Sequence, residues 1–161
     1  MSRVAVADAS PLILLSRADY LQFLELLEPP IQVPDAVAQE IRQKGEADIA
    51  VQTLNNDTRL KVVEAPPIPA SIGNRDLGAG EAAVLAVAQA LPEPIALLDD
   101  LAARRCAQDL DIPVVGTAGL VLAAKRRGVI DEARLVLERL MAHGMYLSPR
   151  TLNALLRRVE E

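Results

Sequence analysis

Carboxylates stand at four places in the sequence where their spacing would allow metal chemistry. Asp8 and the pair Asp99 and Asp100 each follow a short apolar run, while Glu40 and Glu81 lie in stretches with helical periodicity. Carboxylates held close together repel one another unless a cation neutralises them, and ligand sets made only of oxygen select Mg²⁺ or Mn²⁺. Such ions can activate water for in-line attack on a phosphodiester. The pattern therefore predicts a metal-dependent phosphodiesterase.

Each acid also has a purely structural interpretation. Asp8 is placed to cap the turn that follows it, and Glu81, in a first helical turn, would complement the helix dipole. Glu40, taken alone, is a typical solvated helix residue. One member of the pair Asp99 and Asp100 is expected to be a helix N-cap, because two adjacent side chains rarely point the same way. The prediction therefore depends on the set of acids and not on any single one.

Ser10 is a further candidate for the site. Its hydroxyl, two residues after Asp8, could hydrogen-bond a metal-bound water or a ligand carboxylate. The same hydroxyl is also placed to cap a helix that has Pro11 at its first position. His143, the only histidine, lies near a predicted helix end, so the sequence offers no other usual catalytic group.

Short apolar runs alternate along the chain with longer stretches of helical periodicity. Fully apolar strands separated by helices are typical of a parallel sheet covered on both faces, which predicts an α/β fold. Residues 64–75 hold three prolines and a glycine and are predicted to form a loop. The predicted strands are residues 4–7, 31–33, 60–63, 95–98 and 113–115, and the predicted helix caps include Asp19, Thr117, Asp131 and Ser148.

This fold would bring the acids together. Ligands of an open parallel sheet bind at the carboxyl ends of its strands. If strands 4–7 and 95–98 are neighbours, the acids that follow them meet at one edge of the sheet. Glu40 is predicted on a helix that follows a strand, and Glu81 in the first turn of a helix that precedes one, so both can face that edge.

Composition limits the partners of the chain. Its 161 residues, 51% of them hydrophobic, fit one domain that can bury a core. A formal net charge of −5 argues against a general, sequence-blind nucleic-acid coat but does not exclude a nuclease, because bound metal offsets catalytic acids. Only Tyr20, Phe23 and Tyr146 are aromatic, so any RNA contact is expected to depend on metal ions, Arg and Lys rather than on base stacking.

The sequence also indicates a compartment. Cys106 is the only cysteine, which excludes an intramolecular disulfide and favours a reducing cytoplasm. The apolar run that follows the first three residues is too short for a signal peptide or a membrane span. We therefore expect a cytoplasmic, soluble protein.

Four motifs resemble those of PIN domains, in the same order and spacing and across almost the whole chain. They are VADASPL around Asp8, VPDAVAQEI around Glu40, GAGEAAVLA around Glu81, and ALLDD ending at Asp99 and Asp100. The segment IPVVGT ending at Thr117, followed after Ala118 by GLVLAAKRRG, is especially similar to a prokaryotic PIN-like branch related to the VapC-type toxins of toxin–antitoxin pairs.

The resemblance implies a three-layer α/β/α sandwich with a mostly parallel central sheet. It implies cleavage of RNA that depends on Mg²⁺ or Mn²⁺, with Asp8, Glu40, Glu81, Asp99, Asp100 and Ser10 in the active site. It also implies a homodimer and, often, an antitoxin partner. Residues 1–147 would form the nuclease domain, and residues 148–161 a C-terminal helix packed on it or extending it, which would serve dimerisation or partner binding.

Two departures from the family pattern affect this site. Glu81 stands where many toxin members have Asp, and its longer side chain moves the carboxylate. The fourth motif offers two acids: counting back from the following helix favours Asp100, whereas counting forward from Glu81 favours Asp99. Both acids stay candidates at this point.

Two other functions compete with the nuclease. One is a non-catalytic PIN-fold interaction module, which the missing basic surface favours. The other is a phosphatase or phosphotransferase of the haloacid-dehalogenase type, which also places an Asp after its first strand. That chemistry wants a second Asp two residues further on, where this chain has Ser10. We therefore expect a metal-dependent endoribonuclease.

Overall fold

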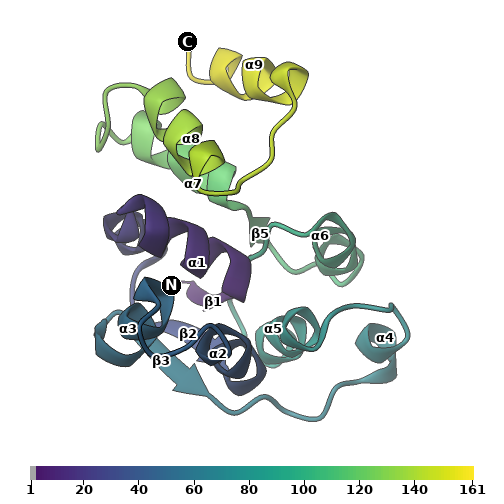
Figure 1. The fold of residues 1–161 in the computed structure, drawn as a ribbon. Coiled ribbons are helices and arrows are strands. Elements are labelled where there is room, and N and C mark those ends of the chain that lie inside the picture. The colour runs from purple at the N-terminus through teal and green to yellow at the C-terminus, as the bar shows by residue number, and fades with distance from the viewer. Residues whose placement is uncertain (1–2) are drawn as a thin grey trace.

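The computed structural model describes residues 3–161 and contains one five-stranded sheet (Figure 1). The strand order is β3-β2-β1-β4-β5, and every pair is parallel. This confirms the predicted α/β fold with a parallel sheet. Residues 1 and 2 of the predicted 1–147 domain lie outside the described residues. The strands are β1 (Val4–Ala7), β2 (Ile31–Pro34), β3 (Leu60–Val63), β4 (Pro94–Leu97) and β5 (Val114–Val115).

Helices connect the strands and flank the sheet. In Figure 1, the last three helices gather at the top of the view with the C-terminus, whereas α2 to α5 occupy its lower part. The helices in the described chain are α1 (Ala9–Ala18), η1 (Leu21–Leu27), α2 (Asp35–Arg42), α3 (Ile49–Asn56), α4 (Ala70–Gly73), α5 (Ala79–Gln89), α6 (Leu101–Asp109), α7 (Thr117–Arg126), α8 (Ala133–Ala142) and α9 (Pro149–Arg157).

Strand β1 lies at the centre of the sheet between β2 and β4, and the residues of β1 and β4 are all apolar. Their register pairs Val4 with Pro94 and Ala7 with Leu97. The backbone N–H of Asp8 then donates to the carbonyl of Leu97 at 3.1 Å. The two strands therefore end at the same level, and the acids that follow them emerge at the same edge of the sheet.

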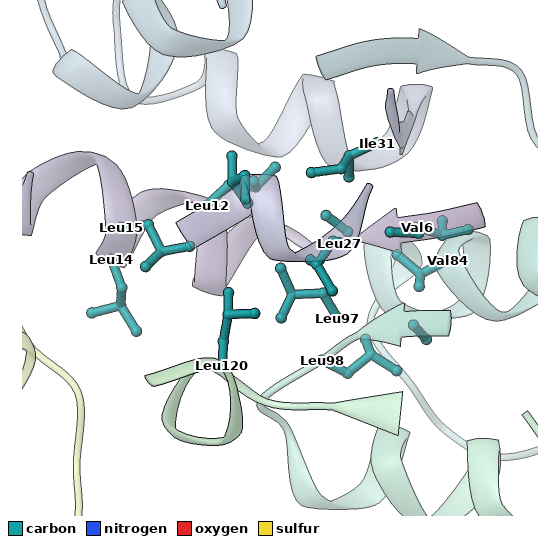
Figure 2. Packing of buried hydrophobic residues seen from close by; sticks show 14 of the residues in the cluster. Val6, Leu12, Leu14, Leu15, Leu27, Ile31, Val84, Leu97, Leu98 and Leu120 are labelled. Atoms are coloured by element: carbon teal, nitrogen blue, oxygen red, sulfur yellow. The ribbon is translucent and has the colours of Figure 1, made fainter. Parts of the chain in front are cut away.

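The core lies between the sheet and its helices and consists mostly of Ala, Val, Leu and Ile. Figure 2 shows Leu12 and Leu15 of α1 next to Leu97 of β4 and Leu120 of α7. All four side chains are at most 2% exposed. Burying such side chains is the main stabilising contribution to a fold of this kind, and here it also holds the strand ends that carry the acids.

Several predicted helix boundaries were wrong. Asp19, predicted to cap the second helix, instead ends α1 with a left-handed φ of 64°. The following residues, Leu21–Leu27, form a 3₁₀ helix. The predicted loop at 64–75 contains the short helix α4. By contrast, Ser148 caps α9 as predicted, because its hydroxyl accepts a hydrogen bond from the backbone N–H of Thr151 at 3.1 Å.

Asp131 was predicted to cap α8, but this prediction was wrong. The cap comes from the C-terminal end of the chain. The carboxylate of Glu161 accepts hydrogen bonds from the backbone N–H groups of Ala133 at 2.6 Å and Arg134 at 3.0 Å. It also pairs with Lys125 of α7 at 3.3 Å. Together with the buried Leu156, these bonds tie the segment that follows residue 147 to α7 and α8.

Candidate active site

Acids from two neighbouring strands begin the site. Asp8 directly follows β1, and Asp99 and Asp100 follow β4 after Leu98. Asp8 is only 6% exposed. It stands at the N-cap of α1, but its side chain makes no capping hydrogen bond. The carboxylate of Asp8 therefore does not make the helix-capping hydrogen bond that the structural alternative calls for.

Gly80 lets the second and third acidic motifs approach Asp8. Helix α5 packs closely on α2, and Gly80 in its first turn is buried. A Cβ at this position would lie 3.3 Å from Oε1 of Glu40 and 3.4 Å from Oδ1 of Asp8. A side chain at residue 80 would press on the carboxylate of Glu40, so the glycine here lets the backbone of α5 lie close to both acids.

The carboxylates also influence one another electrostatically. Burial raises the pKa of Asp8 to about 6; the backbone N–H of Ala9 opposes part of this rise, and the charges of Glu40, Asp99 and Asp100 add to it.

The pKa of Glu81 is raised as well. Burial raises its pKa to about 7, with further contributions from the charge of Asp100, the charge of Asp8, a hydrogen bond with Asp100 and the charge of Glu40. All four acidic motifs therefore converge at one edge of the sheet.

Asp99 and Asp100, which the sequence could not separate, have different partners. Asp100 is the N-cap of α6, and its Oδ2 accepts a hydrogen bond from the backbone N–H of Ala103 at 3.0 Å. Asp99 is held by Thr117 of the next helix: its Oδ1 accepts from the Thr117 backbone N–H at 2.7 Å and its Oδ2 from the Thr117 hydroxyl at 2.6 Å.

Thr117 is the residue whose role the sequence reasoning missed. It was predicted as the cap of α7, but the N-cap is Gly116 and Thr117 is the first helical residue. Its side chain is fully buried and points to Asp99, 18 residues earlier in the chain. The IPVVGT motif was the available signal, because a hydroxyl at the end of a strand next to the acidic edge can orient a carboxylate.

Arg104 and Ser10 lie beside this acid pair. Arg104 of α6 passes over Gly116, where a Cβ would collide with its Nη1 atom and lie 3.0 Å from Oδ1 of Asp99. Ser10 is exposed in the first turn of α1. It lines a surface pocket together with Asp99 and Arg104. Ser10 is not the N-cap that the sequence favoured, since that position belongs to Asp8.

The donor chemistry of the site fits a hard divalent cation. Asp8, Glu40, Glu81 and Asp100 offer only carboxylate oxygens, the ligands that Mg²⁺ and Mn²⁺ prefer. Within residues 3–161, however, no group of three or more His, Cys, Asp or Glu side chains is already arranged to hold a metal ion. Burial, and after it the charges of neighbouring acids, raises the pKa values of Asp8 and Glu81, and a cation bound here would favour their ionised forms.

These pKa values predict how the stability of the metal-free protein depends on pH. Glu81 keeps its proton in the folded state up to a pKa of about 7, whereas an unfolded Glu loses it near 4.5. The free energy of unfolding should therefore fall as pH rises from about 4.5 to 7. The Glu81→Gln variant lacks this contribution, so its melting temperature should fall less than that of wild type over the same range. Equal pH profiles measured by calorimetry in EDTA would contradict the assignment.

Comparison with known protein families identifies the family to which the chain belongs. A family model described as DUF3368, a PIN domain, matches residues 4–161. Comparison with curated proteins finds no match. None of the helices in residues 3–161 combines the length and the apolar character that a membrane crossing requires. PIN domains in general are nucleases. The chain, matched from its first strand to its final residue, belongs to the PIN-domain family.

Proposed function

We propose that this protein is an endoribonuclease that hydrolyses RNA phosphodiesters with the help of Mg²⁺ or Mn²⁺. The observation that carries the proposal is the convergence of carboxylates from four motifs at the carboxyl edge of a parallel sheet. Burial and mutual repulsion raise the pKa of two of them, Asp8 and Glu81. Perturbed acids gathered in this way are frequent in active sites.

In this proposal, Asp8, Glu40, Glu81 and one or both of Asp99 and Asp100 hold one or two divalent ions. When bound, such ions supply Lewis-acid chemistry: they lower the pKa of water and stabilise the charge on the attacked phosphate. The role of the protein is to position the metal-binding acids. Core packing holds Asp8 at the end of β1, and the α2–α5 contact across Gly80 holds Glu40 and Glu81 near it.

Thr117 is a positioning residue in this scheme. It does not touch the substrate, but its hydroxyl and backbone N–H hold both oxygens of Asp99. Outer hydrogen bonds of this kind orient metal-binding carboxylates and tune their affinity. Ser10, exposed on the rim beside Asp99, is placed to donate a hydrogen bond to a substrate oxygen or a ligand carboxylate.

The biological setting is part of the same proposal. Because the motifs after β5 resemble the branch related to VapC-type toxins, we propose that the protein acts on RNA in the cytoplasm. An antitoxin that blocks the acidic edge would then control its activity. Residues 1–147 would serve as the nuclease domain, and residues 148–161 as its packed C-terminal helix.

We also propose a homodimer. Large apolar side chains stay exposed on the single chain, among them Leu135 at 59% and Leu101 at 60%. Burying such surface against a second copy would be favourable. Light scattering should therefore report twice the chain mass at micromolar concentration. A monomer at high micromolar concentration would contradict this proposal without affecting the nuclease.

Titration of metal into the protein tests the function directly. Calorimetry should detect Mn²⁺ binding at or below millimolar concentration, and single-stranded RNA should be cut only when Mn²⁺ or Mg²⁺ is present. Glu138→Gln is the matched control, because Glu138 lies on α8 and, within residues 3–161, pairs only with Arg134 at 3.7 Å. It should bind metal like wild type.

A non-catalytic interaction module is the competing function. The net charge of −5 and the lack of a ready-made ligand set within residues 3–161 favour it. It predicts neither metal binding near millimolar concentration nor RNA cleavage. Both negative results together would replace the nuclease by this module.

A further inference from the structure

A pocket opens next to the proposed catalytic acids and shares Asp99 with them. It has a volume of about 230 Å³. The loop between α8 and α9 forms one side of it, and α1, α6 and the start of α7 form the rest. The lining residues that matter here are Ser10, Leu14, Asp99, Arg104, Met145 and Tyr146. Because Ser10 and Asp99 belong to both, the pocket is continuous with the acidic edge.

Tyr146 is the unusual member of this lining. Its side chain is 84% exposed, although large aromatic rings normally contribute to a fold by being buried. The other tyrosine, Tyr20, shows the normal behaviour: its ring stacks on Phe23 with centroids 5.1 Å apart, and the guanidinium of Arg139 lies 5.5 Å from its centroid. Tyr146 has no such structural task within residues 3–161, so its ring is free to contact a ligand.

Arg104 supplies the positive charge of the pocket. Within the described chain it forms no ion pair with an acid. Its guanidinium lies over Gly116, next to Asp99. A half-buried arginine that forms no ion pair within residues 3–161 is a suitable partner for a phosphate oxygen.

We propose that this pocket is a nucleotide subsite for the residue next to the scissile phosphate of single-stranded RNA. The base would stack on Tyr146 over the apolar floor of Leu14 and Met145, and Arg104 would bind the adjacent backbone phosphate. This inference rests on the proposed ribonuclease function and adds the position of the substrate to it.

The expected selectivity follows from the lining. An aromatic ring and a guanidinium accept any base, because every base offers a stacking face. The subsite should therefore require an unpaired nucleotide, whose base can leave its neighbours, and should show little preference among the four bases. The proposal differs from the expectation, drawn from composition, that RNA contacts depend on metal ions, Arg and Lys rather than on base stacking, because one ring in the right place is sufficient.

Binding of RNA in EDTA tests the subsite separately from catalysis. The probe is a fluorescein-labelled single-stranded RNA of mixed sequence, followed by anisotropy at low ionic strength. Tyr146→Leu should weaken binding by about fivefold or more, the smallest loss expected for one stacked base. Tyr146→Phe keeps the ring and should bind like wild type. Ile49→Ala, at an exposed apolar position on α3 outside the pocket, is the control for general surface effects.

The outcomes separate the two proposals. If Tyr146→Leu binds RNA as wild type does, or if wild type binds no RNA, the subsite is wrong even for an active nuclease. If Tyr146→Leu loses affinity but no protein cuts RNA with Mn²⁺, the subsite stands and the nuclease is wrong. If both stand, Tyr146→Leu should raise KM for single-stranded RNA by a similar factor and leave kcat close to wild type.

Discussion

Replacing Asp8 by Asn should remove RNA cleavage and leave the metal-free protein at least as stable as wild type. Asp8 is 6% exposed and its pKa is raised to about 6 by burial, so its ionised form is costly at neutral pH. Asn keeps the shape and removes the charge. We expect a gain of roughly 0.5–2 kcal/mol in the free energy of unfolding in EDTA, as is common when a charge kept for function is removed.

The same variant should respond differently to metal. If the proposed site is correct, Mn²⁺ should stabilise wild type by mass action, because it would bind the folded state. Asp8→Asn should gain much less and should cut RNA at least about a hundredfold more slowly, since it lacks a ligand on which the metal chemistry depends. Melting temperature with and without Mn²⁺, together with cleavage of a mixed RNA pool, decides the matter. Asp131→Asn, at an exposed position, is the control.

One combination of results would contradict the proposed role of Asp8. If Asp8→Asn melts lower than wild type without metal, gains as much from Mn²⁺ and still cuts RNA, then Asp8 has only a structural role. The carboxylate-cluster mechanism would then be wrong at the residue that the sequence and the structure both place at its centre.

The second large effect is expected at Thr117. Thr117→Val keeps the shape and the backbone N–H bond but removes the hydroxyl that donates to Asp99 at 2.6 Å. Hydrogen bonds to charged groups contribute roughly 1.5–3 kcal/mol, and Thr117 is fully buried, so the free energy of unfolding should fall by about that amount. Without the bond, Asp99 can rotate away from the acidic edge.

The catalytic consequence distinguishes positioning from simple stability. Thr117→Val should require more Mn²⁺ for half-maximal cleavage, by about 10- to 100-fold, as for other losses of outer hydrogen bonds to metal ligands. Thr117→Ser retains the hydroxyl and should recover most of the metal affinity. If Thr117→Val is less stable but has unchanged Mn²⁺ dependence, Asp99 is not a metal ligand and Asp100 is the remaining candidate from the fourth motif.

Local sequence patterns were sufficient to predict the fold and to select the candidate acids. Apolar runs such as Val4–Ala7, each ended by an acid or a turn, contain the information for buried parallel strands. Parallel strands all end at one edge. Asp8 could therefore be assigned to that edge from local pattern alone, and the parallel sheet confirms the assignment.

The partners of Asp99 and Glu161 could not be predicted from the sequence and are given by the tertiary structure. The contact of Thr117 with Asp99 joins residues 18 positions apart, and the cap that Glu161 provides for Ala133 joins residues 28 apart. Local propensity favoured Thr117 and Asp131 as caps because it considers only neighbours in the chain. Packing brought stronger partners from a distance, since a carboxylate gains more from a fixed pair of donors than from solvent. Tyr146 is the opposite case. A tyrosine is expected to bury its ring, but the fold exposes the ring of Tyr146 beside the acidic edge.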